Sequence, residues 1–401
     1  MKITDVRVIL TLVGPRNSIF VFIDTDEGIT GISETVYKRR SKSVEATILD
    51  LKRSLIGKDP TRIEDIFEKM YRDSFFVGGP FHTTPMSAIE IALWDIVGKS
   101  LNAPIYKLLG GPTRDQIPVY CHCPAGATPE MFAENATACV ARGYQAMKVT
   151  LPIFYGAAAK LELGGGQTDQ TFGYSGSHGT IEPSHKETEI LEPDIFKRIA
   201  EFFAAARQAV GPKVHLAVDC HGRLSTANAK CLVEALEPYN LLFIEEPVPP
   251  ENVEALSEVS TYSKTPIATG ERWSTVYDAR RFLGRRAMAI AQPDVVNCGG
   301  LAQAKKIAGM AEAEYVPLAP HNPNGPLATL ASIHLAAAIP NFLILETIGS
   351  EADTALQAEL IHPALEFRNG AIVLPKGPGL GVELDLDACA KYPYEPFEGW
   401  R

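Results

Sequence analysis

Three carboxylates follow three apolar, strand-like segments of the chain at equal intervals. They are Asp219 in VHLAVDCHG, Glu245 in LLFIEEP and Glu271 in PIATGER, each 26 residues after the one before. This interval accommodates one strand, one helix and two loops, so the three residues are expected at the carboxyl ends of neighbouring parallel strands. The equal spacing favours Glu245 over Glu246. Three converging carboxylates suit Mg²⁺ better than Zn²⁺, which prefers nitrogen and sulfur ligands. The alternative is that they are only solvated or salt-bridged.

Two histidines accompany these carboxylates. Residues two apart on a strand face the same way, so His221 is expected on the same side as Asp219. Asp294 in QPD and His321 in APHNPNGP end two further strand patterns at corresponding heights, and Glu346 ends another, FLILET. A hydrogen bond from Asp294 would fix the tautomer of His321 and raise its basicity. A purely structural histidine is the alternative reading.

Together, these residue types predict a proton-transfer site. A cation bound by a substrate carboxylate would stabilise the negative charge that appears when the neighbouring carbon loses a proton. One imidazole would take that proton and the other would protonate a leaving hydroxyl. Metal, base and acid therefore predict β-elimination of water from a hydroxy acid. Which histidine is the base stays open.

The elements that position these residues fit an α/β chain with an eight-stranded (β/α) barrel. Residues 1–115 read as an α+β capping domain, residues 116–349 as the barrel, and the tail 350–401 as packing back on the cap. The segment 151–190 is rich in Gly, Ser and Thr and is either a disordered insertion or a lid or oligomer contact. The expected barrel strands are 117–123, 145–150, 214–220, 241–247, 266–271, 290–296, 315–320 and 343–347.

Composition narrows the class of protein. The chain has 401 residues, 46% hydrophobic and 21% charged, and no apolar run long enough for a membrane helix. The net charge of −10 argues against a nucleic-acid partner, because phosphates would be repelled, but a bound cation would still allow a small anionic substrate. Seven scattered cysteines without zinc-site spacing predict reduced thiols in a cytoplasmic protein.

The chain resembles the enolase superfamily, specifically the mandelate racemase subgroup, and within it the galactonate dehydratases. The resemblance covers nearly the whole chain except the insertion 151–190. It is carried by the segments SAIEIALWDIVGKSLNAPIYKLLGG, DCHGR, FIEEPV, ATGER, QPDVVNCGG, KIAGMAEA, APHNPNGPLA and PGLGVEL. It implies an enolase-like modified barrel and a Mg²⁺-dependent hydro-lyase that converts a small-molecule sugar acid, such as galactonate or gluconate, to a 2-keto-3-deoxy acid. It also implies a homo-oligomer.

The resemblance also implies roles for individual residues. Mg²⁺ would be bound by Asp219, Glu245 and Glu271. The base that removes the C2 proton would be His321, with Asp294 as its partner. His221 would assist loss of the C3 hydroxyl, and Glu346 would hydrogen-bond the enolate-like intermediate. The reverse assignment of the two histidines is an alternative. A cycloisomerase or epimerase using the same enolate, or a non-catalytic relative, is the alternative function.

One departure from the family pattern concerns the second strand. Many relatives carry Lys-X-Lys there, whereas this chain has Lys148-Val149-Thr150, which disfavours racemisation because the second base is missing. Lys148 is expected to contact the substrate carboxylate, buttress the metal or form a structural ion pair. The long insertion resembles the corresponding loop of the mannonate dehydratases, so Tyr155 within it is a further candidate substrate contact. The other candidates are Arg16, Arg39 and His82 in the capping domain.

Overall fold

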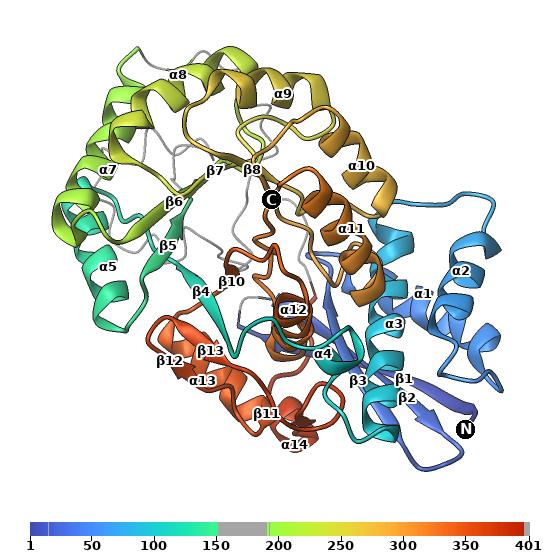
Figure 1. Cartoon of the computed structure of the whole chain (residues 1–401). Helices are drawn as coiled ribbons and strands as arrows, with labels where there is room; N and C mark the ends of the chain where they lie inside the picture. The colour runs from blue at the N-terminus through green and yellow to red at the C-terminus, as the bar shows by residue number, and fades with distance from the viewer. Residues whose placement is uncertain (15, 151–190, 192, 397–401) are drawn as a thin grey trace.

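The computed structural model describes residues 1–14, 16–150, 191 and 193–396. An N-terminal antiparallel sheet is formed by β1 (Ile3–Val13), β2 (Arg16–Thr25) and β3 (Thr30–Val36), in that order. Helices α1 (Ser41–Leu55) and α3 (Pro80–Ser100) pack on this sheet, and α2 (Ile63–Asp73) packs on α3. This is the capping unit at one side of the ring in Figure 1.

Strand β2 is buried on both faces. Ile19, Val21 and Ile23 belong to the core that the capping helices complete, whereas Phe20 and Phe22 belong to the larger core shared with the barrel. Because strand side chains alternate between faces, a strand covered on both sides reads as a continuous apolar run, as SIFVFI does here. The cap therefore packs on the barrel through its own central strand.

A ring of parallel strands follows the cap, with helices outside it (Figure 1). Its strands are β4 (Gln116–His122), β5 (Ala146–Val149), β6 (His215–Asp219), β7 (Ile244–Glu245), β8 (Ile267–Thr269), β9 (Ile290–Ala291) and β10 (Leu345–Thr347). The order runs from β4 to β9, and β10 pairs with β4 in parallel. The outer helices are α5 (Pro129–Ala141), α7 (Ile195–Val210), α8 (Thr226–Leu236), α9 (Val253–Tyr262), α10 (Val276–Gly284), α11 (Leu301–Ala313) and α12 (Pro326–Ala338).

The seventh predicted strand, 315–320, is reduced to one bridging residue. Leu318 bridges Ala291 on one side and Phe342 on the other, and both bridges are parallel. Pro317 and Pro320 flank it and have no N–H to donate, so a longer ladder cannot form. Backbone hydrogen bonds from Ala319 to Ala291 (2.9 Å) and from Leu343 to Leu318 (2.7 Å) still carry the sheet across this position.

The interior of the ring confirms the predicted (β/α) barrel. A separate apolar cluster takes one buried residue from each of the eight predicted strand segments. Its members are Tyr120, Ala146, Ala217, Phe243, Ala268, Ile290, Ala319 and Ile344. Inward-facing side chains from every strand are typical of a filled barrel, and these eight form a floor beneath the strand ends.

The C-terminal segment contacts both units. It contains α13 (Glu351–Leu360), β11 (Ile361–His362), β12 (Phe367–Arg368), β13 (Ala371–Val373), β14 (Glu383–Leu384) and α14 (Leu386–Ala390). Strand β13 pairs antiparallel with β4 of the barrel, while the Leu12 N–H of the cap donates to Tyr392 O at 2.9 Å. Two short helices, α4 (Ile105–Leu108) and η3 (Glu237–Tyr239), complete the described elements.

Two buried carboxylates of the cap accept hydrogen bonds from the first turns of barrel helices. Glu90 of α3 accepts from the N–H groups of Leu301 (2.8 Å) and Ala302 (2.9 Å), at the start of α11. Glu34 of β3 accepts from Leu327 (2.9 Å) at the start of α12. The first N–H groups of a helix have no partner within the helix, and its dipole favours negative charge there. These contacts help to set the orientation of the cap on the barrel.

None of the helices in the described ranges combines the length and apolar character that a bilayer crossing requires.

Candidate active site

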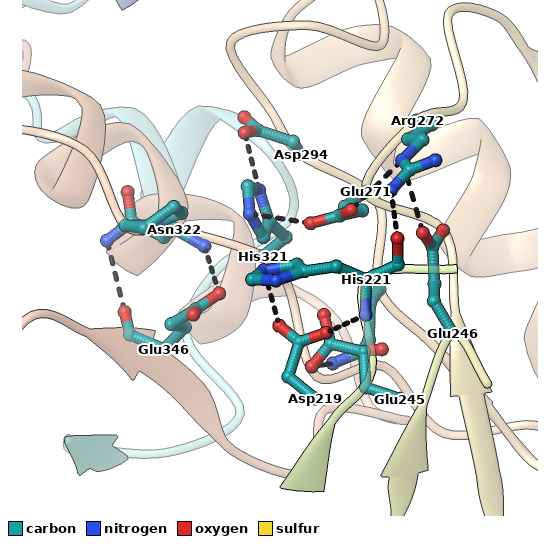
Figure 2. Close-up of polar contacts among 12 residues, drawn as sticks. Asp219, His221, Glu245, Glu246, Glu271, Arg272, Asp294, His321, Asn322 and Glu346 are labelled. Carbon is teal, nitrogen blue, oxygen red and sulfur yellow. Dashed lines mark hydrogen bonds and ion pairs between the residues drawn. The ribbon is translucent and has the colours of Figure 1, made fainter. Parts of the chain in front are cut away.

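The predicted carboxylates end neighbouring strands of the barrel. Asp219 is the last residue of β6 and pairs in register with Glu245, the last residue of β7. Glu271 lies two residues beyond β8, and all three side chains are nine-tenths or more buried. Glu246 turns away: its φ is +37°, and it accepts a hydrogen bond from Thr269 Oγ1 at 3.0 Å. The strand-end side chains therefore face one another (Figure 2).

Lys148 of β5 lies among these carboxylates and is itself buried. Its Nζ is 3.2 Å from Asp219 Oδ2, 2.8 Å from Glu245 Oε2 and 2.8 Å from Glu346 Oε1. Burial alone would lower the pKa of Lys148, but Glu245 and Glu346 raise it well above its ordinary value. Burial and the charge of Asp219 raise the pKa of Glu245 to about 8. Lys148 is thus the internal counter-ion of a strongly acidic cluster.

His321 is held by two carboxylates. Its Nδ1 is 2.8 Å from Asp294 Oδ2 and its Nε2 is 3.1 Å from Glu271 Oε2. Burial would lower the pKa of His321, but the charge of Glu346 and the hydrogen bonds to Asp294 and Glu271 raise it well above its ordinary value. Asp294 also accepts from the Asn324 side chain at 3.2 Å, which fixes its orientation. The predicted hydrogen bond between Asp294 and His321 is therefore present.

His221 follows β6 by two residues, and its ring lies between Asp219 and His321 (Figure 2). Its φ is +50°, a left-handed conformation that places both its N–H and its ring over Asp219. The N–H donates to Asp219 Oδ1 at 3.0 Å, and Nε2 is 3.2 Å from Asp219 Oδ2. Arg272 Nη2 donates to the His221 carbonyl at 3.0 Å, so the main chain is held as well.

Glu346 completes the ring of strand-end groups and has more partners than the sequence suggests. The Asn322 N–H donates to its Oε2 at 2.9 Å, and His122 Nε2 lies 2.5 Å from its Oε1. His122 ends β4, the first barrel strand, and was not among the predicted site residues. Its place at a strand end is the signal that could have found it, because polar strand-end residues meet at the barrel mouth.

The three candidate substrate contacts of the cap differ in their position relative to the pocket beside His321. Arg16 is buried and lines a pocket of about 510 Å³ together with Glu271 and His321. Arg39 is half-buried next to the pocket-lining Lys38. The structure does not bring His82 to this pocket, because its Nδ1 accepts from the Gly78 N–H at 3.0 Å and its Nε2 donates to Met70 O at 3.3 Å. Tyr155 lies outside the described residues.

Comparison with family models assigns both parts of the chain. Residues 2–110 match the model described as mandelate racemase / muconate lactonizing enzyme, N-terminal domain, and residues 131–388 match the enolase C-terminal domain-like model. The chain belongs to this family. The predicted membership of the enolase superfamily is confirmed, and with it the prediction that the chain is an enzyme.

Several individual proteins are similar over almost the whole chain. A D-galactonate dehydratase of Ralstonia pickettii (strain 12J) is 36% identical, with 92% of this chain and 90% of the relative covered. A D-mannonate dehydratase of Caulobacter vibrioides is 33% identical, with 98% and 96% covered. Crystal structures of a mandelate racemase/muconate lactonizing enzyme from Jannaschia sp. CCS1 and of an enolase-superfamily member from Salmonella Typhimurium give TM-scores of 0.86 and 0.85. Both are 30% identical and cover 98% of each chain.

Enolase-superfamily sites generally use Mg²⁺ with a histidine or lysine base. In the described part of the chain, no group of three or more His, Cys, Asp or Glu residues is arranged to hold a metal ion as the side chains stand. Lys148 and the two histidines instead engage oxygens of Asp219, Glu245 and Glu271. The donor set nevertheless fits Mg²⁺ in kind, because all three candidate ligands are carboxylates at or just after the ends of neighbouring strands. Glu245 Oε1 is buried and has no hydrogen-bond partner among the described residues.

Proposed function

We propose that this protein is a Mg²⁺-dependent dehydratase of sugar acids that forms a 2-keto-3-deoxy acid. The observation that carries the proposal is the Asp294–His321 contact of 2.8 Å, with a second histidine, His221, 3.2 Å from the strand-end carboxylate of Asp219. An oriented base, an acid and a cation-binding carboxylate group are the three functions that β-elimination next to a carboxylate requires. The relatives named D-galactonate and D-mannonate dehydratase support this reaction class.

His321 is the group that removes the proton at C2. Asp294 accepts from Nδ1–H, so in the neutral ring the lone pair is on Nε2, the nitrogen directed toward Glu271. A carboxylate partner also stabilises the imidazolium that forms when the proton is taken. Bound by Asp219, Glu245 and Glu271, Mg²⁺ would supply positive charge for the negative charge that builds on the substrate carboxylate.

His221 is the group that donates a proton to the departing C3 hydroxyl. Its ring is held at 3.2 Å from Asp219, and its carbonyl accepts from Arg272, so the ring has a fixed approach to the site. Glu346 is held by Asn322 and Lys148 near the base, where it can accept a hydrogen bond from the substrate. These roles place the acid and the base on separate strand ends.

A racemase or epimerase would need a base on each face of the substrate carbon. Thr150 stands where many relatives have the second lysine, and Lys148 is engaged by three carboxylates. Both facts favour elimination over inversion.

The test is a screen of aldonates and aldarates with Mg²⁺-loaded protein, with 2-keto products detected by semicarbazide. We expect turnover by the wild type. In D₂O, the H221N variant should exchange the C2 proton without elimination, and H321N should do neither. Epimerised or ring-opened acids without 2-keto product would refute the dehydratase proposal, and exchange by H321N but not H221N would reverse the two histidine roles.

We also propose a cytoplasmic homo-oligomer. All seven cysteines are free thiols, which is usual in a reducing compartment. The oligomer rests on the family resemblance, and sedimentation of the purified protein tests it.

A further inference from the structure

The pocket above the barrel has chemically different ends. Its barrel side is lined by His321, Glu271 and Asp294, and its cap side by Arg16 and Lys38. Its volume of about 510 Å³ lies in the range of small-molecule sites. A molecule bound in this pocket can therefore contact groups of both the barrel and the cap.

The cap side of the pocket is basic. Arg16, the first residue of β2, is buried, and its guanidinium donates to the carbonyl of Pro323, two residues beyond His321. Lys38 follows β3 by two residues, and Arg39 is next to it. Lys38 is exposed at the edge of the pocket; neighbouring protein atoms and the positive charges of Arg16 and Arg39 lower its pKa to about 8. The three cations are therefore close enough to repel one another.

The acidic groups of the same pocket are held at its barrel side. Glu271 is 3.1 Å from His321 and 3.2 Å from Arg272, and Asp294 is 2.8 Å from His321. These contacts direct both carboxylates to the candidate catalytic groups. The pocket thus has the base and the acidic groups on its barrel side and Arg16 and Lys38 on its cap side, with Glu271 close enough to Lys38 to act on its pKa.

We propose that the substrate carries a second anionic group at the end remote from its reacting carboxylate, and that Arg16 and Lys38 bind this group. Such a substrate is a doubly anionic sugar acid, either an aldarate or a terminally phosphorylated aldonate. A terminal carboxylate or phosphate accepts charge-assisted hydrogen bonds from arginine and lysine that a neutral hydroxymethyl group cannot match. This inference rests on the proposed function and specifies the substrate class of the same site.

The experiment compares matched pairs of ligands on the Mg²⁺-loaded protein, by calorimetry and by kcat/KM. The pairs are galactarate with galactonate, glucarate with gluconate, and 6-phosphogluconate with gluconate. We expect the wild type to bind one doubly anionic class roughly 10- to 100-fold more tightly than its singly anionic partner, the contribution of one hydrogen bond between charged groups. Raising the ionic strength should reduce this preference.

The variant K38Q should lose at least about 10-fold of that preference, because it removes one of the two cations that contact the distal anion. The control K42Q removes a similar charge from α1, where Lys42 is exposed and paired with Glu45 at 2.8 Å. It should keep the preference unchanged.

Each outcome separates the two proposals. Equal or tighter binding of the singly anionic acids by the wild type overturns the inference, as does an equal loss for both members of each pair in K38Q. Turnover confined to aldonates refutes the inference alone. An absence of turnover and of binding for every sugar acid refutes the proposed function and the inference together. Tighter binding of the aldarates only, or of the phosphorylated acid only, supports the inference and identifies the distal group as a carboxylate or a phosphate.

Discussion

Replacing Lys148 with methionine tests whether this buried ammonium balances the acidic cluster. The change keeps a linear side chain but leaves Asp219, Glu245 and Glu346 without the cation that now lies 2.8 to 3.2 Å from them. At an effective dielectric constant of about 20, each such contact has a Coulomb energy of roughly 5 kcal/mol, much of it offset by desolvation. Removing one partner of a buried ion pair costs about 3–5 kcal/mol.

The assay is urea unfolding of wild type and K148M in EDTA, followed by circular dichroism. We expect the free energy of unfolding to fall by about 3–5 kcal/mol near pH 8. Lys148 holds the pKa of Glu346 well below its ordinary value, against the effect of burial, so this stability is present above the unfolded pKa and is lost as pH falls. The cost of K148M should therefore shrink at low pH.

Two comparisons decide how the result is read. The control K391M removes an exposed lysine that lies 2.7 Å from Glu359, and its stability should equal that of the wild type. Adding Mg²⁺ should narrow the gap between K148M and wild type, since a bound cation replaces the missing charge. If K148M loses no more unfolding free energy than K391M, the role of Lys148 as counter-ion is refuted. If Mg²⁺ leaves the difference in unfolding free energy between K148M and wild type unchanged, that result counts against metal binding by these carboxylates.

Three further predictions follow from the site and from the contact between cap and barrel. D294N should lower kcat by up to roughly 10⁴-fold, because an amide that donates to Nδ1 selects the wrong tautomer of His321. This prediction is tested by steady-state assays with the substrate that the screen identifies. Burial raises the pKa of Glu34 from 4.5 to about 7, partly opposed by its hydrogen bonds. Its contribution to stability is therefore present below about pH 4.5 and lost as pH rises through 7, so wild type should lose about 3 kcal/mol relative to E34Q over that window in urea titrations. G300A should destabilise by about 3 kcal/mol or more in thermal unfolding, because φ at Gly300 is +90° and a Cβ there would overlap the Glu90 carboxylate.

Controls for these variants come from the chain itself. G57A also places a side chain at positive φ (+78°) but meets no atom within 4 Å, so its cost should be only roughly 1–2 kcal/mol. Equal losses in G300A and G57A would contradict the clash argument. A pH-independent difference between wild type and E34Q would contradict the raised pKa of Glu34, and unchanged kcat in D294N would remove Asp294 from the orientation of His321.

The sequence predicted the features that repeat along the chain. Strand-and-helix periodicity predicted the barrel, and the equal spacing of Asp219 and Glu245 predicted residues that do pair in register across β6 and β7. The neighbouring strand ends of Asp294 and His321 were likewise enough to predict their contact. These predictions succeeded because parallel strands bring equivalent positions to the same edge.

Other features depend on contacts that no local pattern encodes. Arg16 reaches Pro323 across 307 positions of sequence, and its direction depends on how the cap sits on the barrel. His82 was a plausible ligand contact by type, but the Gly78 N–H before α3 and the Met70 carbonyl of α2 contact its two ring nitrogens. The seventh strand was predicted too long because apolar character in YVPLAP outweighed the missing donors of its two prolines.

The carboxylates of Glu90 and Glu34 limit how this architecture can be recombined. Each belongs to the cap but completes the first turn of a barrel helix. A chimera that joined this barrel to another relative's cap without an acidic residue at both places would leave amide groups of α11 and α12 buried and unsatisfied. Engineers who exchange caps to change ligand preference would therefore need to transplant these two acids together with the specificity loops, or select compensating changes at both helix starts.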